Sequence, residues 1–144
     1  MTILVTGSAG HLGEGLMRTL RDRRRSARGV DILASPFTDR VGSIVEREFV
    51  RDCMDGIDTV LHAATLHKPH VETHSPQDFV DVNITGTLNL LEEAARAGVG
   101  AFVFTSTTSA FGDALRPAPD EPATWITEAV VPVAKNIYGA TKTA

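Results

Sequence analysis

The stretch Thr6-Gly7-Ser8-Ala9-Gly10-His11-Leu12-Gly13 decides the fold, because it joins an apolar run to an amphipathic segment. The run before it, Ile3-Leu4-Val5, is typical of a strand that is buried on both faces. The segment after it, from about residue 10 to residue 23, has a leucine at every fourth position and predicts a helix. A strand, a glycine-rich turn and a helix in this order are the context in which a loop cradles a pyrophosphate.

The three glycines of this loop have different roles in that prediction. Gly7 permits the tight turn, Gly10 lets a ligand approach the backbone, and Gly13 lets the helix pack on the strand. Asp31 follows about 20 residues later, where a carboxylate would bind the hydroxyl groups of an adenosine ribose. The sequence therefore predicts a dinucleotide site. The alternative is an ordinary strand–turn–helix whose glycines serve only packing.

Asp31 favours NAD over NADP, because a carboxylate repels a 2′-phosphate. Against it stands the run Arg21-Asp22-Arg23-Arg24-Arg25-Ser26-Ala27-Arg28, since an arginine can pair with a phosphate. We favour a simpler role, in which these cations complement the dipole at the C-terminus of a helix. So short a patch on a protein of net charge −4 predicts no nucleic-acid partner.

Strands and helices alternate along the rest of the chain. We expect strands at residues 27–33, 41–45, 59–63 and 101–105, and helices at residues 47–54 and 76–97. The longer helix is predicted from apolar residues that recur every three or four positions, namely Val80, Ile84, Leu88, Leu91 and Ala95. This alternation predicts an α/β fold with a doubly wound, Rossmann-like parallel sheet, ordered 3-2-1-4-5, that binds ligands at the carboxyl ends of its strands.

Composition limits the classes of function. Of 144 residues, 42% are apolar and 22% are charged, as in an average globular protein and unlike a disordered one. No apolar run approaches the ~20 residues of a membrane span, and the N-terminus has no secretory signal. Cys53 is the only cysteine, which excludes an internal disulfide and a multi-cysteine metal site. We therefore expect a soluble, cytoplasmic protein with one domain and no membrane partner.

A second motif, Tyr138-Gly139-Ala140-Thr141-Lys142, contains the only tyrosine of the chain. Residues four apart share a face of a helix, so the phenol and the ammonium group would be neighbours. A nearby positive charge favours the phenolate, which is the form of tyrosine that can accept a proton. Together with the glycine loop, this spacing predicts a catalytic pair.

With these two motifs the chain resembles the extended short-chain dehydrogenase/reductases, in the branch of NAD-dependent nucleotide-sugar epimerases and dehydratases. The resemblance covers essentially the whole chain. Leu61-His62-Ala63-Ala64-Thr65 is similar to the family's fourth-strand motif, which lines the cofactor, and Asn83 matches a helix asparagine that helps to build the active site. The segment from Thr105 to Gly112 matches the one that carries the catalytic serine or threonine, a role that falls here on Thr107.

The resemblance implies a cofactor, NAD, and a role for each of these residues. Tyr138 would exchange a proton with a sugar hydroxyl while hydride passes to or from NAD. Lys142 would favour the phenolate and hold the nicotinamide ribose, and Thr107 would hydrogen-bond the reacting oxygen. The residues expected to contact the cofactor are Gly7, Gly10, His11, Leu12, Gly13, Asp31, Ser43, Ile44, His62, Ala63, Ala64, Asn83, Tyr138 and Lys142.

Two departures from the family narrow the expected activity. Ser43 stands where many relatives have an aspartate that binds the adenine amine, and Thr108 and Ser109 stand where the sugar dehydratases have Asp and Glu. The second departure argues against a dehydratase. We expect an NAD-dependent epimerase or dehydrogenase that acts on a nucleotide-sugar or a related polyol. The alternative is a non-catalytic, dinucleotide-sensing domain that regulates a partner.

Four histidines at short spacing would be candidate metal ligands: His62, His67, His70 and His74. We predict no metal site, because His62 ends a buried strand and Pro69 prevents one helix from aligning the other three. Trp125 lies in a proline-rich segment between residues 113 and 132. It is expected to be a packing anchor, with a substrate platform as the alternative.

The chain stops at Ala144, inside a predicted helix and without a closing cap. We therefore expect residues 1–144 to be an incomplete NAD-binding Rossmann domain that lacks the C-terminal substrate lobe of the family. Such a piece should be nearly inactive by itself. The full-length protein is expected to form a homodimer.

Overall fold

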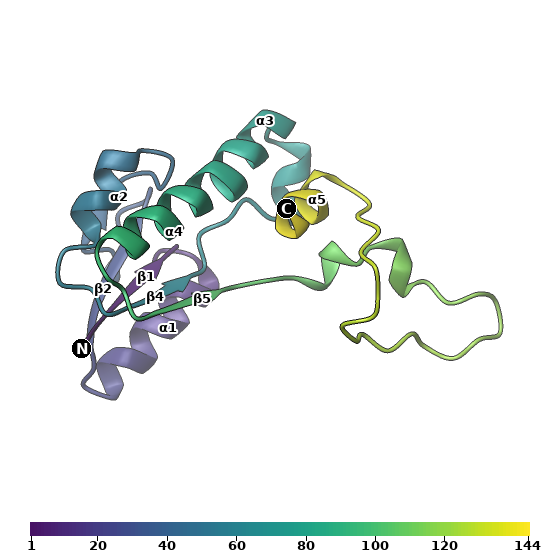
Figure 1. The fold of residues 1–144 in the computed structure, drawn as a ribbon, viewed down its shortest axis with the longest axis horizontal. Helices are drawn as coiled ribbons and strands as arrows, with labels where there is room; N and C mark the ends of the chain where they lie inside the picture. The colour runs from purple at the N-terminus through teal and green to yellow at the C-terminus, as the bar shows by residue number, and fades with distance from the viewer. The chain divides into compact units, whose positions relative to one another are not determined.

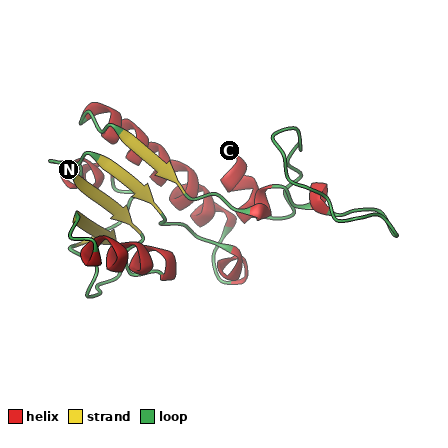
Figure 2. Ribbon diagram, turned by 90° about the horizontal axis from the view of Figure 1, so that it is seen from below, coloured by secondary structure: helices red, strands yellow, loops and turns green.

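The computed structural model describes residues 1–144 and contains one parallel sheet of five strands (Figure 1). The strands lie in the order β3-β2-β1-β4-β5, so the predicted doubly wound order is confirmed. All pairings are parallel, and the arrows of the sheet point the same way (Figure 2). The strands are β1 (Thr2–Thr6), β2 (Ser26–Asp31), β3 (Arg40–Val41), β4 (Thr59–His62) and β5 (Ala101–Phe104).

The chain forms two compact units. Unit 1, Met1–Thr65 with Thr85–Thr105, holds the sheet and the helices α1 (His11–Asp22), α2 (Arg47–Cys53) and α4 (Gly86–Arg96). Unit 2, Leu66–Ile84 with Ser106–Ala144, holds α3 (Pro76–Phe79), α5 (Ile137–Thr143) and the 3₁₀ turns η1 (Lys68–Glu72), η3 (Thr108–Ala110) and η4 (Asp113–Leu115). A π-helical turn, η2 (Val80–Thr85), precedes α4. None of the helices is long and apolar enough to cross a lipid bilayer.

The core of unit 1 forms around β1, which is buried on both faces as predicted. Met17 of α1 packs with Ile3 and Val5 on one face of the sheet. Leu4 is fully buried and points to the opposite face, because successive side chains of a strand alternate. Helices α2 and α4 pack against each other on that face (Figure 1). Both faces of the central strands are therefore covered, as a parallel sheet requires.

Two strands end earlier than the sequence predicts. The second strand stops at Asp31 because the Asp31 carboxylate accepts a hydrogen bond from the backbone of Leu33, which turns the chain and leaves Leu33 exposed. The third strand has only two residues, so the prediction of a strand over residues 41–45 is wrong. The side-chain amide of Asn89 donates to the carbonyl groups of Ile44 and Val45, which therefore bond to α4 and not to a neighbouring strand.

The predicted helix over residues 76–97 is helical throughout, but the apolar residues that predict it do not all lie on its buried face. Two of them, Leu88 and Leu91, are exposed, whereas Leu90 and the polar Asn89 and Glu93 are buried. The π turn at residues 80–85 interrupts the period of 3.6, so the spacing of apolar residues before it does not carry through α4.

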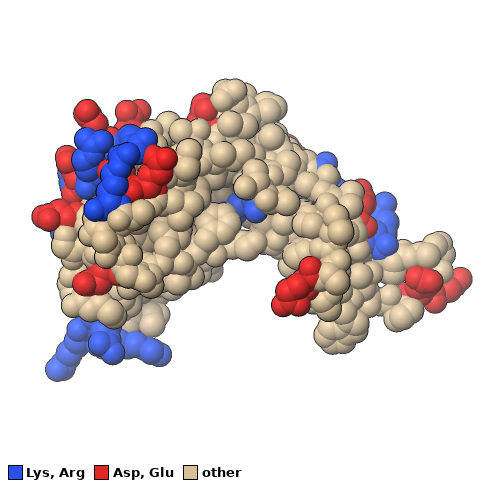
Figure 3. Space-filling model, in the orientation of Figure 1, with Lys and Arg blue, Asp and Glu red and all other residues tan.

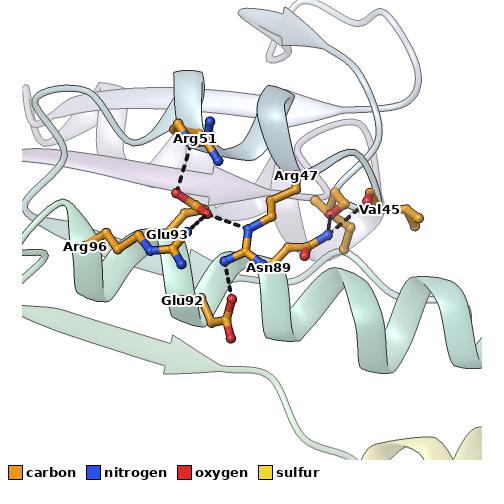
Figure 4. A network of polar contacts seen from close by, with 8 residues as sticks. Val45, Arg47, Arg51, Asn89, Glu92, Glu93 and Arg96 are labelled. Atoms are coloured by element: carbon orange, nitrogen blue, oxygen red, sulfur yellow. Dashed lines mark hydrogen bonds and ion pairs between the residues drawn. The ribbon is translucent and has the colours of Figure 1, made fainter.

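Glu93 is buried because arginines surround it, as Figure 4 shows. Its side chain is only 2% exposed. It accepts hydrogen bonds from Arg47 at 2.7 Å, from Arg51 at 3.3 Å and from Arg96 at 2.6 Å. Arg47 also pairs with the more exposed Glu92. These contacts tie α2 to α4, and the hydrogen bond from Arg47 is the main reason that the pKa of Glu93 lies below its usual value.

We expect Glu93→Gln to lower the urea midpoint of unfolding at an unchanged slope, because a neutral amide cannot balance three guanidinium groups. The lowered pKa means that this stabilisation is present above the usual Glu value of 4.5 and is lost as the pH falls through the lower folded value. The difference between the urea midpoints of the wild type and the variant should therefore become smaller in acid. Glu92→Gln is the matched control and should lower the urea midpoint much less, since Glu92 is 42% exposed. Equal effects of the two variants would contradict this account.

Candidate functional site

The glycine loop of unit 1 is anchored to the end of β2. The amides of Gly7 and Ser8 both donate to the carbonyl of Val30, at 2.9 and 3.2 Å, and the amide of Gly10 donates to Gly7 at 3.0 Å. Gly7 has φ +74°, in the left-handed region that glycine adopts readily. The loop is thus a tight turn between β1 and α1, as the sequence predicts.

The loop leaves no room for side chains at two of its glycines. A Cβ atom on Gly13 would lie 1.9 Å from the carbonyl oxygen of Gly7, and one on Gly7 would lie 2.7 Å from the backbone nitrogen of Ala64. Helix α1 begins at His11, and the first N–H groups of a helix have no intrahelical acceptor. A bare backbone cradle at the positive end of a helix dipole fits the pyrophosphate of a dinucleotide.

Asp31 lies beside this loop at the carboxyl end of β2. One of its carboxylate oxygens accepts from the amide of Ala9 at 3.0 Å, and the other accepts from Leu33 at the same distance. Both oxygens are therefore fixed by backbone amides. This orients the carboxylate at the edge where the sequence predicts a ribose.

The arginine run lies elsewhere. Arg23, Arg24 and Arg25 precede β2, at the amino ends of the strands, and blue side chains gather over this end of α1 (Figure 3). Strand β2 separates them from Asp31 by roughly 16 Å, at about 3.3 Å per residue. Arg28 instead donates to the carbonyls of Cys53 and Asp55. The geometry agrees with a structural and solvated role for the run.

His62 is buried beneath the residues that lie against the glycine loop, namely Ala63 and Ala64. The side chain is buried, with Nδ1 2.7 Å from the Thr6 hydroxyl and Nε2 3.0 Å from the Thr87 hydroxyl. The Thr6 hydroxyl also accepts from the amide of Ala64 at 3.2 Å. The imidazole therefore fixes Ala63 and Ala64, which lie against Gly7. Sequence reasoning missed Thr6 and Thr87, whose roles appear only once β1, β4 and α4 are assembled.

Ser43 and Ile44, both predicted to contact the cofactor, lie in the turn after β3. The Ser43 hydroxyl accepts from the amide of Val45 at 3.2 Å. Ile44 is buried, and a Cβ atom on Gly86 would lie 2.6 Å from its side chain. The side chain of Ile44 thus packs under α4, while His11 and Leu12 at the start of α1 are exposed.

In unit 2, helix α5 carries Tyr138 and Lys142 one turn apart. Asn136 caps it, because its side-chain oxygen accepts from the amide of Gly139 at 3.0 Å. Tyr138 is 8% and Lys142 is 9% exposed, so both side chains are largely removed from water. Burial lowers the pKa of Lys142 to about 8, which leaves it mainly protonated at neutral pH.

Two further segments of unit 2 pack against α5. The turn η3 follows Thr107, and the carbonyl of Ser109 lies where a Cβ on Gly139 would approach it to 2.4 Å. Asn83 is buried in the π turn, and its amide donates to the Thr141 hydroxyl at 3.0 Å. The turn η3 that follows Thr107, the π turn with Asn83 and the helix with Tyr138 and Lys142 therefore pack together within unit 2. No sequence pattern predicts the π turn in which Asn83 lies.

Two other expectations concern a metal site and Trp125. No group of three or more His, Cys, Asp or Glu side chains in residues 1–144 has the geometry to hold a metal ion. Trp125 is 88% exposed, so the prediction of a packing anchor is wrong for this chain. The segment that carries it bonds to the rest of unit 2 mainly at its base, through Gly112 and Val133. Nothing there covers the indole.

Comparison with known proteins gives a consistent result. The model of the NAD dependent epimerase/dehydratase family matches residues 3–144. The chain is 36% identical over 120 residues to sterol demethylase protein B of Methylococcus capsulatus, covering 78% of this chain and 36% of that protein. It is 35% identical over 118 residues to a 3-beta-hydroxysteroid dehydrogenase of Mycolicibacterium neoaurum, covering 74% of this chain and 32% of that protein. It is 28% identical over 159 residues to UDP-glucose 4-epimerase of Erwinia amylovora, covering 99% of this chain and 45% of that protein.

A solved structure agrees with these relatives. A short-chain dehydrogenase/reductase superfamily protein from Agrobacterium tumefaciens, crystallised with bound NAD, superposes with a TM-score of 0.83 at 31% identity. The match covers 99% of this chain and 42% of that one. The chain therefore spans less than half the length of the proteins that it matches.

The glycine loop yields a matched pair of substitutions. Gly13→Ala should destabilise the fold and abolish dinucleotide binding, because a Cβ atom cannot fit 1.9 Å from the Gly7 carbonyl. Gly15→Ala, two residues further on in the same helix, meets no atom within 4 Å and should stabilise the chain, by about 0.5–1 kcal/mol. Thermal unfolding and calorimetric titration with NAD measure both effects. A Gly13→Ala chain as stable as the wild type would show that the loop is looser than described.

Proposed function

Because this chain belongs to the NAD dependent epimerase/dehydratase family, we propose that it binds NAD and supplies the reacting groups for hydride transfer at a secondary alcohol. The observation that carries the proposal is the capped helix α5, which buries Tyr138 and Lys142 one turn apart. A domain that only senses a dinucleotide has no need of a buried tyrosine and lysine there. An enzyme is therefore the better account.

The chain's own residues would hold NAD at the edge of the sheet. The amides at the start of α1 and the bare loop from Gly7 to Gly13 would bind the pyrophosphate. The Asp31 carboxylate, held by the amides of Ala9 and Leu33, would accept from the adenosine ribose. Ala63 and Ala64 would form the wall beside them, with His62 acting through that wall. Bound NAD supplies the hydride acceptor.

The groups of unit 2 would handle the proton. Tyr138 as phenolate would take the proton of the substrate hydroxyl, and the Lys142 ammonium would stabilise that phenolate and hold the nicotinamide ribose. The Thr107 hydroxyl would donate to the reacting oxygen. Asn83 would act by holding α5 through Thr141. These roles need Lys142 to keep its proton, which its pKa of about 8 allows at neutral pH.

Two substrate classes fit a secondary alcohol. A nucleotide-sugar is the leading candidate, because a UDP-glucose 4-epimerase matches 99% of the chain. A 3β-hydroxysteroid is the second, because the dehydrogenase of that class is more nearly identical, at 35% against 28%. We further propose that residues 1–144 form the cofactor-binding part of the enzyme and that a longer protein supplies the substrate lobe.

The cofactor is tested on the 144-residue chain by calorimetric titration. NAD should bind more tightly than NADP, and Asp31→Ala should weaken NAD binding by about ten- to a hundredfold, the value of one or two hydrogen bonds to a charged group. Asp22→Ala, an exposed aspartate beside the arginine run, is the control and should change nothing. Tighter binding of NADP would overturn the assignment of Asp31 to the adenosine ribose.

Turnover is tested in a protein as long as the relatives that contains these residues. Tyr138→Phe should leave NAD binding intact and reduce kcat by about 10²–10⁴, the usual contribution of a general acid–base. Activity should also decline above pH 8, where Lys142 loses its proton. Assays with UDP-glucose and with a 3β-hydroxysteroid decide between the substrate classes. Undiminished turnover by Tyr138→Phe would refute the proposed mechanism.

A further inference from the structure

Three histidines outside the proposed catalytic groups lie next to one another in unit 2, within and beside the turn η1. The ring centroids of His67 and His70 are 4.5 Å apart at an interplanar angle of 78°, and those of His70 and His74 are 5.1 Å apart at 68°. The rings meet edge to face, and no group of three or more His, Cys, Asp or Glu side chains in residues 1–144 could hold a metal ion.

One hydrogen bond in this turn fixes the protonation state of His70. The backbone amide of His67 donates to Nδ1 of His70 at 3.0 Å. A backbone N–H can only donate, so Nδ1 must carry a lone pair and the ring must be neutral. Protonation of Nδ1 would set two N–H groups against each other and break this bond, which closes the turn together with the backbone hydrogen bond from the His70 amide to the His67 carbonyl at 2.8 Å.

The surroundings of His70 also oppose its protonation. Burial, His67 and His74 lower the pKa of His70, in that order. The charged or titratable groups near it on its own segment and on the elements next to it are His67, Lys68, Glu72 and His74, then Asp78 of α3, and Tyr138 and Lys142 of α5. Positive charge on His67 or His74 opposes a further positive charge on His70, because like charges repel.

This turn supports the helix that carries the catalytic pair. The turn η1 packs against α5. Just before it, both backbone groups of Leu66 bond to the side-chain amide of Asn83, at 2.8 and 2.9 Å. The same amide donates to Thr141 of α5. The position of α5 within unit 2 thus depends on residues 66–74 keeping their conformation.

We propose that the turn of His67, His70 and His74 is a pH-sensitive brace, closed when His70 is neutral and open when it is protonated, so that acid loosens α5. The sign follows from linkage. A base whose folded pKa is lowered contributes stability above its unfolded value of 6.5, and that stability is lost as the pH falls below it. The proposal rests on the proposed function in one respect, which is that α5 carries the catalytic residues.

Amide exchange of the 144-residue chain, followed by NMR without NAD or substrate, tests the brace. After correction for the intrinsic rate, the His67 amide should lose protection by at most about tenfold for each pH unit below 6.5, until the lowered pKa of the closed turn is reached. Amides of α5 should lose protection over the same range. Protection that stays constant between pH 7.5 and pH 5.5, in the turn or in α5, would overturn the proposal.

Two variants separate the brace from general acid unfolding. His70→Asn keeps an acceptor near the position of Nδ1 but does not titrate, so protection at His67 should persist in acid. Equal loss in this variant and in the wild type would overturn the proposal. His74→Gln removes a neighbouring charge and should raise the midpoint of the His67 change together with the His70 ring titration. An unmoved midpoint would also overturn it, whatever the outcome of the NAD and turnover experiments.

Discussion

The close approach of the Gly13 backbone to the Gly7 carbonyl sets the geometry of the whole carboxyl edge of unit 1. It brings α1 against β1, and it places the start of that helix beside the carboxylate of Asp31. The same turn needs Ala64 within contact of Gly7, which the buried pair of Thr6 and His62 enforces. At this edge the backbone segments lie so close together that only glycine fits at Gly7 and Gly13. The buried hydrogen bond between Thr6 and His62 supports that arrangement.

The opposite face of the sheet is organised by charge. Helices α2 and α4 meet through Glu93 and its arginines, and the Asn89 amide of α4 binds the carbonyls of the turn after β3. A buried carboxylate is tolerated only when it is fully paired, so this contact specifies one alignment of the two helices. The cost is that the alignment depends on a few residues.

Local chemistry explains what could be predicted from the sequence. The glycine loop, the burial of β1 and the strand order follow from short-range patterns and from the chirality of crossovers. The exposed Leu88 and Leu91 of α4 could not be predicted, because the π turn before them disrupts the helical period. The short third strand depends on Asn89, more than forty residues further along the chain. For the candidate site, the motifs identified Tyr138, Lys142 and Thr107 as residues of interest, whereas their catalytic roles stay predictions.

The exposed Trp125 determines what fluorescence can report about this protein. It is the only tryptophan, it belongs to unit 2, and its indole is already surrounded by solvent in the folded chain. Unfolding of the sheet therefore changes little in the environment of the indole, and the loss of the Rossmann-like core is almost silent in tryptophan emission. The same exposure makes the indole a sensitive reporter of anything that covers it, because a solvated fluorophore shifts its spectrum when it is enclosed. Tryptophan emission from this chain thus reports encounters of unit 2 rather than the integrity of the sheet.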